Sequence, residues 1–190
     1  MLVLVRHGRT RVNAEGRLQG RIDEPLDEVG DAQAAAIGRA LGRVDQVITS
    51  PLLRARGTAA HVDGPLTVDE RWLELDYGTL DGTLTREVPR DVWQRWRSDI
   101  DYVPAGGESI AALAVRVGAA LDDLAALAGD RTVVVVTHVS PIKAAVAWAL
   151  RAPPELTWRT HLDQASITRI AVGPAGPVLH GYNDTCHLHR

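Results

Sequence analysis

The chain has 190 residues, of which 45% are hydrophobic and 24% are charged, and its formal net charge is −3 at pH 7. This size and composition indicate one soluble globular domain over residues 1–190, and the slight negative charge argues against a nucleic-acid partner. The first apolar run is too short for a membrane span and Cys186 is the single cysteine, so we expect a cytoplasmic protein with no membrane partner and no disulfide framework.

The first ten residues carry the most information. Residues 2–5 predict a short strand buried on both faces, because the apolar positions do not alternate with polar ones. Arg6 and His7 follow where this strand ends, and open parallel sheets bind ligands at the carboxyl ends of their strands. A second apolar run over residues 133–136 leads in the same way to His138. Two buried strands that each deliver a histidine predict two imidazoles facing one pocket.

A polar loop over residues 9–23 follows the first strand. Its many polar side chains favour ligand binding over a plain connection, with Thr10, Asn13 and Gln19 among the candidates. Asp27 is a typical N-cap for a helix that extends to Leu41. We expect this helix to cross over to the next strand.

The second helix is predicted to begin beside an anion site. A short strand over residues 46–49 precedes Ser50 and Pro51, which we interpret as a helix cap followed by proline at the first helical position. Arg54 then lies in the opening turn, where unpaired backbone N–H groups and the helix dipole favour an anion. Its planar guanidinium adds donors suited to phosphate.

The middle of the chain supplies carboxylates but does not show which of them act. After a third strand over residues 66–68, spacing alone leaves four candidates open: Glu70, Glu74, Asp76 and Asp81. A helix is predicted over residues 85–96 despite Pro89. We interpret its Trp93 and Trp96 as packing residues, with a role in a lid as the minor alternative.

The remaining chain alternates between helices and strands. An amphipathic helix is predicted to open at Glu108 and Ser109 and to extend to Leu127. After the strand that leads to His138, the expected elements are a helix over 141–150, a short helix, and strands near 166–172 and 178–182. Alternating strands and helices indicate βαβ units. We therefore expect an α/β fold with three α/β/α layers and a mainly parallel central sheet.

Several familiar catalytic motifs are missing. The sequence has no P-loop, no dinucleotide-binding glycine turn and no nucleophile elbow, and its C-terminal histidines and cysteine match no standard zinc spacing. What remains is two histidines and two arginines at strand ends, with carboxylates available. Histidine can accept a phosphoryl group covalently, while guanidinium groups bind its oxygens and a carboxyl group transfers protons. This pattern favours phosphoryl transfer without a metal.

A set of short motifs runs from one end of the chain to the other. They are Leu4-Val-Arg-His-Gly-Arg-Thr10 with Asn13, Gln19-Gly20 and Asp23-x-Pro-Leu26, Gly30-x-x-Gln33-Ala34, Thr49-Ser-Pro-Leu-x-Arg54-Ala, Leu73-Glu74-x-x-Tyr77-Gly78-x-x-x-Gly82, Gly106-Gly-Glu-Ser109, Val136-Thr-His138 and Asn183-Asp184. In these motifs and in their order the chain resembles the histidine phosphatase superfamily, in its phosphoglycerate mutase-like branch. Any one motif would be weak evidence, but the ordered set is specific.

The resemblance implies a phosphoglycerate mutase-like fold and assigns roles by position. His7 would be the nucleophile that becomes phosphohistidine, and Glu74 would be the general acid and base. The phosphoryl oxygens would be bound by Arg6, Arg54 and His138. Further contacts to phosphate or to the rest of the substrate would come from Asn13, Thr10, Gln19, Gly20 and the backbone N–H of Val139. The family members it resembles need no metal or other cofactor.

Substrate and reaction are less narrowly defined by the sequence. Arg9, Asp81 and residues 139–141 depart from the family pattern, which affects substrate choice more than chemistry. Only a short connector joins Glu74 to Gly106, whereas mutases of this family carry a longer insertion that closes the site against water. We therefore expect a phosphatase for small phosphomonoesters with a mildly acidic optimum. The alternatives are phosphoglycerate mutase-type transfer and a catalytically silent phosphate-binding module, and a homodimer is compatible with the sequence.

Overall fold

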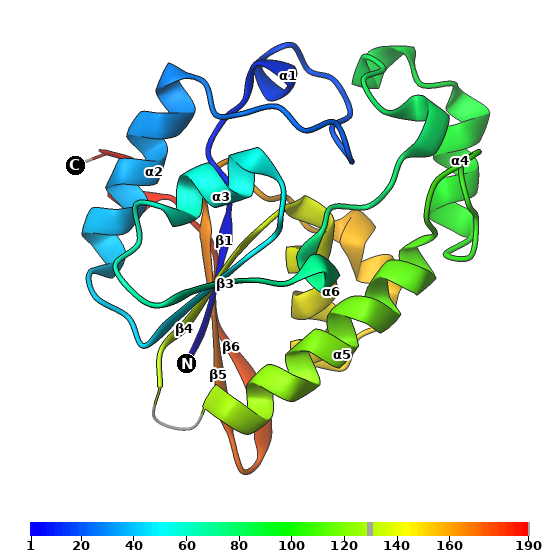
Figure 1. Cartoon of the computed structure of the whole chain (residues 1–190). Coiled ribbons are helices and arrows are strands. Elements are labelled where there is room, and N and C mark those ends of the chain that lie inside the picture. The colour runs from blue at the N-terminus through cyan, green and yellow to red at the C-terminus, as the bar shows by residue number, and fades with distance from the viewer. Residues whose placement is uncertain (129–130, 190) are drawn as a thin grey trace.

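A six-stranded sheet lies at the centre of the computed structural model, which describes residues 1–128 and 131–189 (Figure 1). The strands occur in the order β3-β2-β4-β1-β5-β6. Their bounds are β1 Leu2–Arg6, β2 Gln46–Thr49, β3 Leu66–Val68, β4 Val133–Thr137, β5 Ile167–Gly173 and β6 Gly176–Asp184. The first four strands pair in parallel, whereas β5 pairs antiparallel with β1 and β6 antiparallel with β5. The prediction of a mainly parallel sheet is confirmed.

Helices cover both faces of this sheet (Figure 1). They are α1 Arg11–Ala14, α2 Glu28–Leu41, α3 Leu53–Ala59, α4 Arg90–Ser98, α5 Ile110–Ala128 and α6 Val139–Leu150. Because successive side chains of a strand point to opposite faces, Leu2 and Leu4 of β1 pack in the core with α5 and α6, and Val3 and Val5 pack with α2 and α3. The three-layer α/β/α fold is therefore confirmed.

The strand register brings the candidate site residues to one edge of the sheet. Arg6, the last residue of β1, pairs with Thr137, the last residue of β4, so His7 and His138 leave neighbouring strands at the same level. Ser50 leaves β2 at the other side of β4, where its N–H donates to the carbonyl of Val136 at 3.1 Å. Segments separated by as many as 131 residues, such as His7 and His138, thus meet at the carboxyl edge.

Three predicted helix starts are wrong, and a proline lies at or near each of them. Helix α3 begins at Leu53 rather than at Pro51, and the N–H of Leu53 donates to the carboxylate of Asp23 at 2.6 Å. The helix predicted over residues 85–96 is divided into a 3₁₀ turn at Thr85–Glu87 and α4. Pro89 has no N–H to donate and keeps Val88 extended, so α4 can only start after it.

Helix α6 shows the opposite case. It begins at Val139, whereas the sequence predicts that it begins two residues later, at Pro141. A proline in the first turn costs little, because the first N–H groups of a helix have no intrahelical partner. The consequence is that the N–H groups of Val139 and Ser140 lie at the site edge of the sheet.

Glycines allow the loop after β1 to pack closely on α2. A methyl group on Gly8 would collide with the backbone of Gly30, and one on Gly30 would collide with the backbone of Arg9. Gly8 and Gly30 therefore allow the loop after β1 to lie against α2 at a distance that side chains would prevent.

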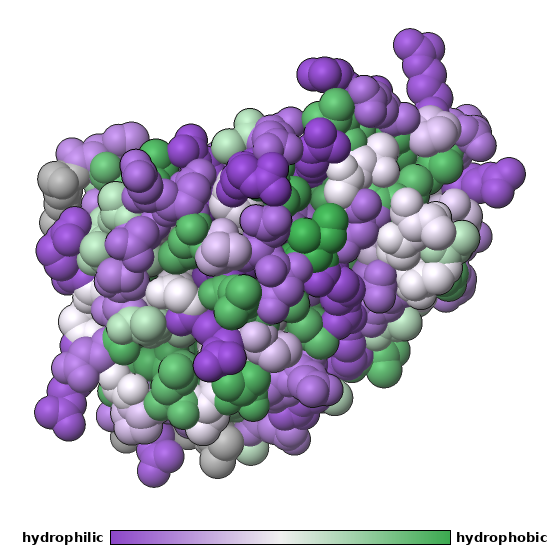
Figure 2. Space-filling view, turned by 45° about the horizontal axis from the view of Figure 1, so that its top comes forward, coloured by the Kyte–Doolittle hydropathy of each residue, from purple (hydrophilic) through white to green (hydrophobic). Residues whose placement is uncertain are grey.

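On the face shown in Figure 2, hydrophobic side chains occur in small groups between hydrophilic ones. None of the helices in the described ranges combines the length and apolarity needed to cross a membrane.

Candidate active site

His7 lies at the centre of the site, and its hydrogen bonds define which nitrogen is reactive. Its Nδ1 lies 2.7 Å from the carbonyl oxygen of Gly8, which can only accept, so Nδ1 carries the proton. Nε2 is then unprotonated, and it accepts a hydrogen bond from Nε of Arg54 at 3.2 Å. Burial, followed by the charges of Arg54 and Arg6, holds the pKa of His7 well below its ordinary value. The ring is therefore neutral, and the lone pair on its unprotonated Nε2 is engaged by Arg54.

Arg54 is fully buried next to this lone pair. Its Nη1 donates to the carbonyl of Ile22 and its Nη2 to the carbonyl of Gly20, both at 2.8 Å. Burial lowers the pKa of Arg54 to about 10, so the guanidinium is still a cation at neutral pH. Backbone carbonyls fix its orientation without neutralising its charge.

Asp81 fastens the loop that supplies these carbonyls. Its carboxylate accepts from the backbone N–H groups of Gly20, Arg21 and Ile22 at 2.7, 2.8 and 2.8 Å. The sequence interpretation treats Asp81 as one of four open acidic candidates and as a departure from the family pattern. In the structure it holds the loop over Arg54, a role that spacing along the chain could not reveal.

Arg6 adds a second guanidinium, whose positive charge is little balanced by its neighbours. Its Nη1 donates to the carbonyl of Leu162 at 2.6 Å, and its buried Nε has no partner in the described part of the chain. Within residues 1–128 and 131–189, neither Arg6 nor Arg54 forms an ion pair with a carboxylate. Two cations without anionic partners beside a neutral histidine make this edge of the sheet a binding site for an anion.

His138 contributes the second imidazole of the site. The ring is fully buried, and its centroid lies 5.1 Å from that of His7 with the planes at 61°. Its Nε2 lies 2.8 Å from the hydroxyl of Ser50, while its Nδ1 has no partner among the described residues. Burial and the charge of Arg54 lower its pKa well below the ordinary value. Ser50, predicted as a helix cap, accepts a long hydrogen bond from the N–H of Leu52 at 3.4 Å and also holds this ring.

Glu74 lies at the beginning of α6. Its carboxylate accepts from the N–H groups of Leu75 at 2.7 Å, Val139 at 3.0 Å and Ser140 at 3.1 Å, and its side chain is buried. The predicted donor Val139 is therefore beside the site, but its N–H is already used by Glu74. Of the other acidic candidates, Glu70 is exposed and Asp76 lies 3.9 Å from Arg21.

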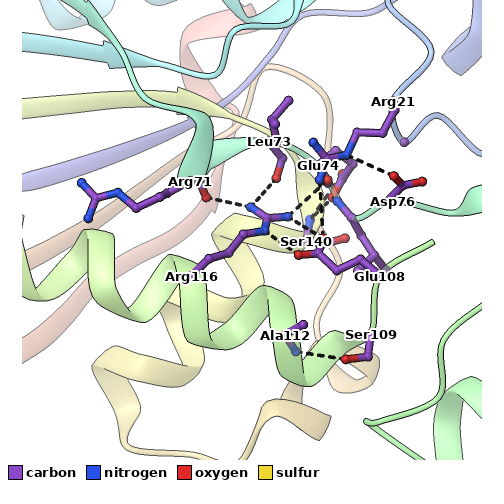
Figure 3. A network of polar contacts seen from close by, with 12 residues as sticks. Arg21, Arg71, Leu73, Glu74, Asp76, Glu108, Ser109, Ala112, Arg116 and Ser140 are labelled. Carbon is purple, nitrogen blue, oxygen red and sulfur yellow. Dashed lines mark hydrogen bonds and ion pairs between the residues drawn. The ribbon is translucent and has the colours of Figure 1, made fainter. Parts of the chain in front are cut away.

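Arg116 of α5 organises the segment that carries Glu74 (Figure 3). Its Nη1 donates to the carbonyls of Arg71 and Leu73 at 2.7 and 2.8 Å, and its Nη2 to the carbonyl of Glu74 at 3.3 Å. Its other donors form a two-pronged ion pair with Glu108 at 2.7 and 2.8 Å. The sequence analysis missed Arg116, because only its motif partner Glu108 belongs to a recognisable pattern.

The polar residues of the first loop lie together but bind mainly one another. Gln19 Oε1 accepts from the hydroxyl of Thr10 at 2.7 Å and from Nδ2 of Asn13 at 3.1 Å. The buried Nε2 of Gln19 has no partner in the described residues and is the free donor of this group. Gly20 uses both backbone groups, its N–H on Asp81 and its carbonyl on Arg54. Thr10 and Asn13 thus orient Gln19, and Gly20 orients Arg54.

Comparison with known proteins places these motifs in one family. The profile of the histidine phosphatase superfamily (branch 1) matches residues 2–185. A bifunctional protein of Mycobacterium tuberculosis is 36% identical over 177 residues, which cover 88% of this chain and 49% of that protein. Phosphoserine phosphatase 1 of Hydrogenobacter thermophilus is 33% identical over 198 residues, covering 98% of this chain and 93% of the relative.

A solved structure extends the comparison to the fold. A mutant of phosphoserine phosphatase from Entamoeba histolytica, in complex with phosphoserine, superposes with a TM-score of 0.91 at 30% identity over 98% of each chain. The chain spans about half the length of the first curated relatives it matches and nearly the whole length of the two phosphoserine phosphatases. Because one profile covers every strand of the sheet and each residue around His7, the chain belongs to the histidine phosphatase superfamily, branch 1.

Proposed function

We propose that the protein hydrolyses small-molecule phosphomonoesters through a phosphohistidine on His7, without a metal. The observation that carries the proposal is the unprotonated Nε2 of His7, which the buried Arg54 orients by a hydrogen bond beside the second imidazole of His138. A neutral nucleophile among unpaired cations suits attack on a dianionic phosphoryl group, whose charge the guanidinium groups bind in the transition state.

The reaction has two balanced steps. Nε2 of His7 bonds to phosphorus while the ester P–O bond breaks, and Glu74, protonated before this step, gives its proton to the leaving alkoxide. A water molecule then attacks the phosphohistidine and Glu74 takes its proton, so the P–N bond breaks and inorganic phosphate leaves. Arg6, Arg54 and Nδ1 of His138 bind the phosphoryl oxygens in both steps. The free amide of Gln19 is a further donor at the loop, oriented by Thr10 and Asn13.

The proposal is tested with a panel of phosphomonoesters in the presence of a metal chelator. We expect wild type to release phosphate and to become labelled on His7, and His7→Ala to do neither, with a loss of at least about a thousandfold because the covalent route disappears. A protein that binds phosphate but is never labelled by any ester would be a binding module. Full activity of His7→Ala would exclude the covalent route.

A second assay separates hydrolysis from mutase-type transfer. We expect phosphate release to exceed phosphoglycerate interconversion, because the short connector between Glu74 and Gly106 should leave the site open to water during the reaction. Efficient interconversion with little release would make the mutase the correct assignment. A cytoplasmic location and a homodimeric state stay predictions, which fractionation and analytical ultracentrifugation test directly.

A further inference from the structure

A largely apolar cavity of about 250 Å³ lies between α4, α5 and α6. It is lined by Trp96 from α4, Gly118 from α5 and Ala147 from α6, and the proposed reaction uses none of these residues. Many of its lining residues, Trp93, Trp148 and Trp158 among them, are only half-buried, so the cavity is open to solvent on one side. A smaller apolar cavity, about 150 Å³ in volume, is large enough to bind benzene in another protein.

The cavity begins at the wall of the candidate active site. Val139 and Ser140, the first two residues of α6, line the cavity. The backbone N–H groups of the same two residues donate to the carboxylate of Glu74. Tyr77, three residues after Glu74, lines it as well. In the proposed reaction the oxygen of the leaving group must lie at Glu74. The carbon chain of the leaving alcohol, which is attached to that oxygen, therefore begins at the same place as the cavity.

The lining defines the shape and polarity of a ligand. From Val139 to Trp148 it follows ten residues of α6, whose ends lie about 14 Å apart along the helix. In the described part of the chain no acidic residue lines the cavity, and its one charged residue, Lys143, donates to the carbonyl of Thr157 at 2.9 Å. A long and uncharged group fits such a space, whereas an ammonium group would find no anionic partner.

Gly118 keeps the far part of the cavity open. A β-carbon placed on this residue would have no other atom within 4 Å. Glycine inside a helix is unfavourable relative to alanine, because it loses more conformational freedom on folding. The local sequence of α5 therefore gives no reason for a glycine here, but a need for space does.

We infer that this cavity binds the apolar part of the leaving alcohol, so that the favoured substrates are phosphate monoesters of elongated, uncharged apolar alcohols. The inference rests on the proposed function, because it places the ester oxygen at Glu74. Residues of α5 and α6 then select the substrate, whereas residues at the carboxyl edge of the sheet transfer the phosphoryl group.

A chain-length series tests the inference. Ethyl, butyl, hexyl and octyl phosphate have leaving groups of nearly the same chemistry and differ in apolar length, and all are used below their micelle concentrations. We expect kcat/KM to rise by about two- to fourfold per added methylene group until the cavity is filled. A flat or falling series in an enzyme that hydrolyses ethyl phosphate would overturn the cavity assignment.

Two variants of α5 make the test specific. Gly118→Leu fills the cavity, so we expect the ratio of kcat/KM for octyl phosphate over ethyl phosphate to fall by on the order of tenfold. Ala119→Leu, at the next and exposed position, is the matched control and should keep the wild-type ratio. An unchanged ratio in Gly118→Leu would contradict the inference.

A binding measurement separates this inference from the proposed function. Trp93, Trp96, Trp148 and Trp158 line the cavity, so 1-octanol should change the tryptophan fluorescence of wild type and of Ala119→Leu, but not of folded Gly118→Leu. This readout needs no turnover. If 1-octanol binds in this way but no ester is hydrolysed, the proposed function fails and the substrate assignment fails with it. If ethyl phosphate is hydrolysed and 1-octanol does not bind, only the cavity assignment fails.

Discussion

At the scale of single residues, the hydroxyl of Ser50 decides which nitrogen of His138 can meet a ligand. It engages Nε2 at 2.8 Å and leaves Nδ1 without a partner among the described residues. The Ser-Pro dipeptide predicts a helix cap by its local pattern. The same hydroxyl accepts from the N–H of Leu52 at 3.4 Å, but its shorter contact is with an imidazole 88 residues away. Sequence reasoning therefore found the position but not its role at the site.

Substitution of this serine should therefore affect turnover. Ser50→Ala removes the partner of His138, so we expect kcat/KM for an alkyl phosphate to fall by about tenfold, in line with the worth of one buried hydrogen bond. Ser166→Ala is the matched control, because Ser166 is also fully buried and its hydroxyl has no partner in the described residues. Equal kinetics of the two variants would mean that Ser50 does not orient the ring.

The protonation of His7 gives a prediction for the pH profile. Burial and the neighbouring arginines hold its pKa well below 6.5, and only the neutral ring can attack. Activity should therefore persist as the pH falls through 6.5, and the acid limb of kcat/KM, corrected for ionisation of the substrate, should lie well below that value. A limb at or above pH 6.5 would show that His7 titrates as an ordinary histidine.

At the scale of elements, Arg116 connects α5 to the segment that carries Glu74. The helix itself is predicted from periodicity, and it spans Ile110–Ala128 as its apolar pattern indicates. Its interaction with three backbone carbonyls of the chain between β3 and α5 is not predictable in this way. Arg71 lies in the short 3₁₀ helix Glu70–Trp72 and the other two carbonyls lie in the loop after it, and nothing in the local sequence shows that they need a donor.

Loss of this connection should weaken both folding and turnover. Arg116→Ala removes both close hydrogen bonds to the largely buried Glu108 and leaves it only Arg21 at 3.7 Å, so we expect the free energy of unfolding to fall by about 2–3 kcal/mol. We also expect kcat to fall more than KM rises, because Glu74 is displaced while the phosphate-binding residues stay in place. Urea denaturation and steady-state kinetics measure the two effects. Arg39→Ala on exposed helix surface should stay within about 0.5 kcal/mol of wild type, and a similar result for Arg116→Ala would exclude the positioning role.

At the scale of the whole molecule, the site makes folding sensitive to acid. His7 and His138 are neutral in the fold because their pKa values are lowered, whereas in the unfolded chain a histidine binds a proton below about pH 6.5. The unfolded state then binds more protons than the folded state, so stability decreases as the pH falls below that value. Above it, the two histidines contribute no pH dependence.

The direction of this pH dependence of stability can be measured in the same experiment that tests the single-domain prediction. We expect urea unfolding to show one transition by circular dichroism and by fluorescence, with a lower midpoint at about pH 5.5 than at about pH 7.5. His138→Gln should reduce this difference, while His180→Gln, at an exposed position, should not. Two separate transitions would contradict a single domain, and a midpoint that rises towards acid would contradict the buried neutral histidines.

The sequence by itself determined the strands β1 and β4, the histidines at their ends, the α/β layers and the family motifs, because each of these follows from residues that are neighbours along the chain. The tertiary structure alone decided that Asp81 fastens the loop over Arg54, that Ser50 holds His138, and that a cavity opens beside Glu74. These features depend on distances between segments tens of residues apart. Such distances arise only when burial of apolar side chains has packed the helices on the sheet, and no local pattern encodes them.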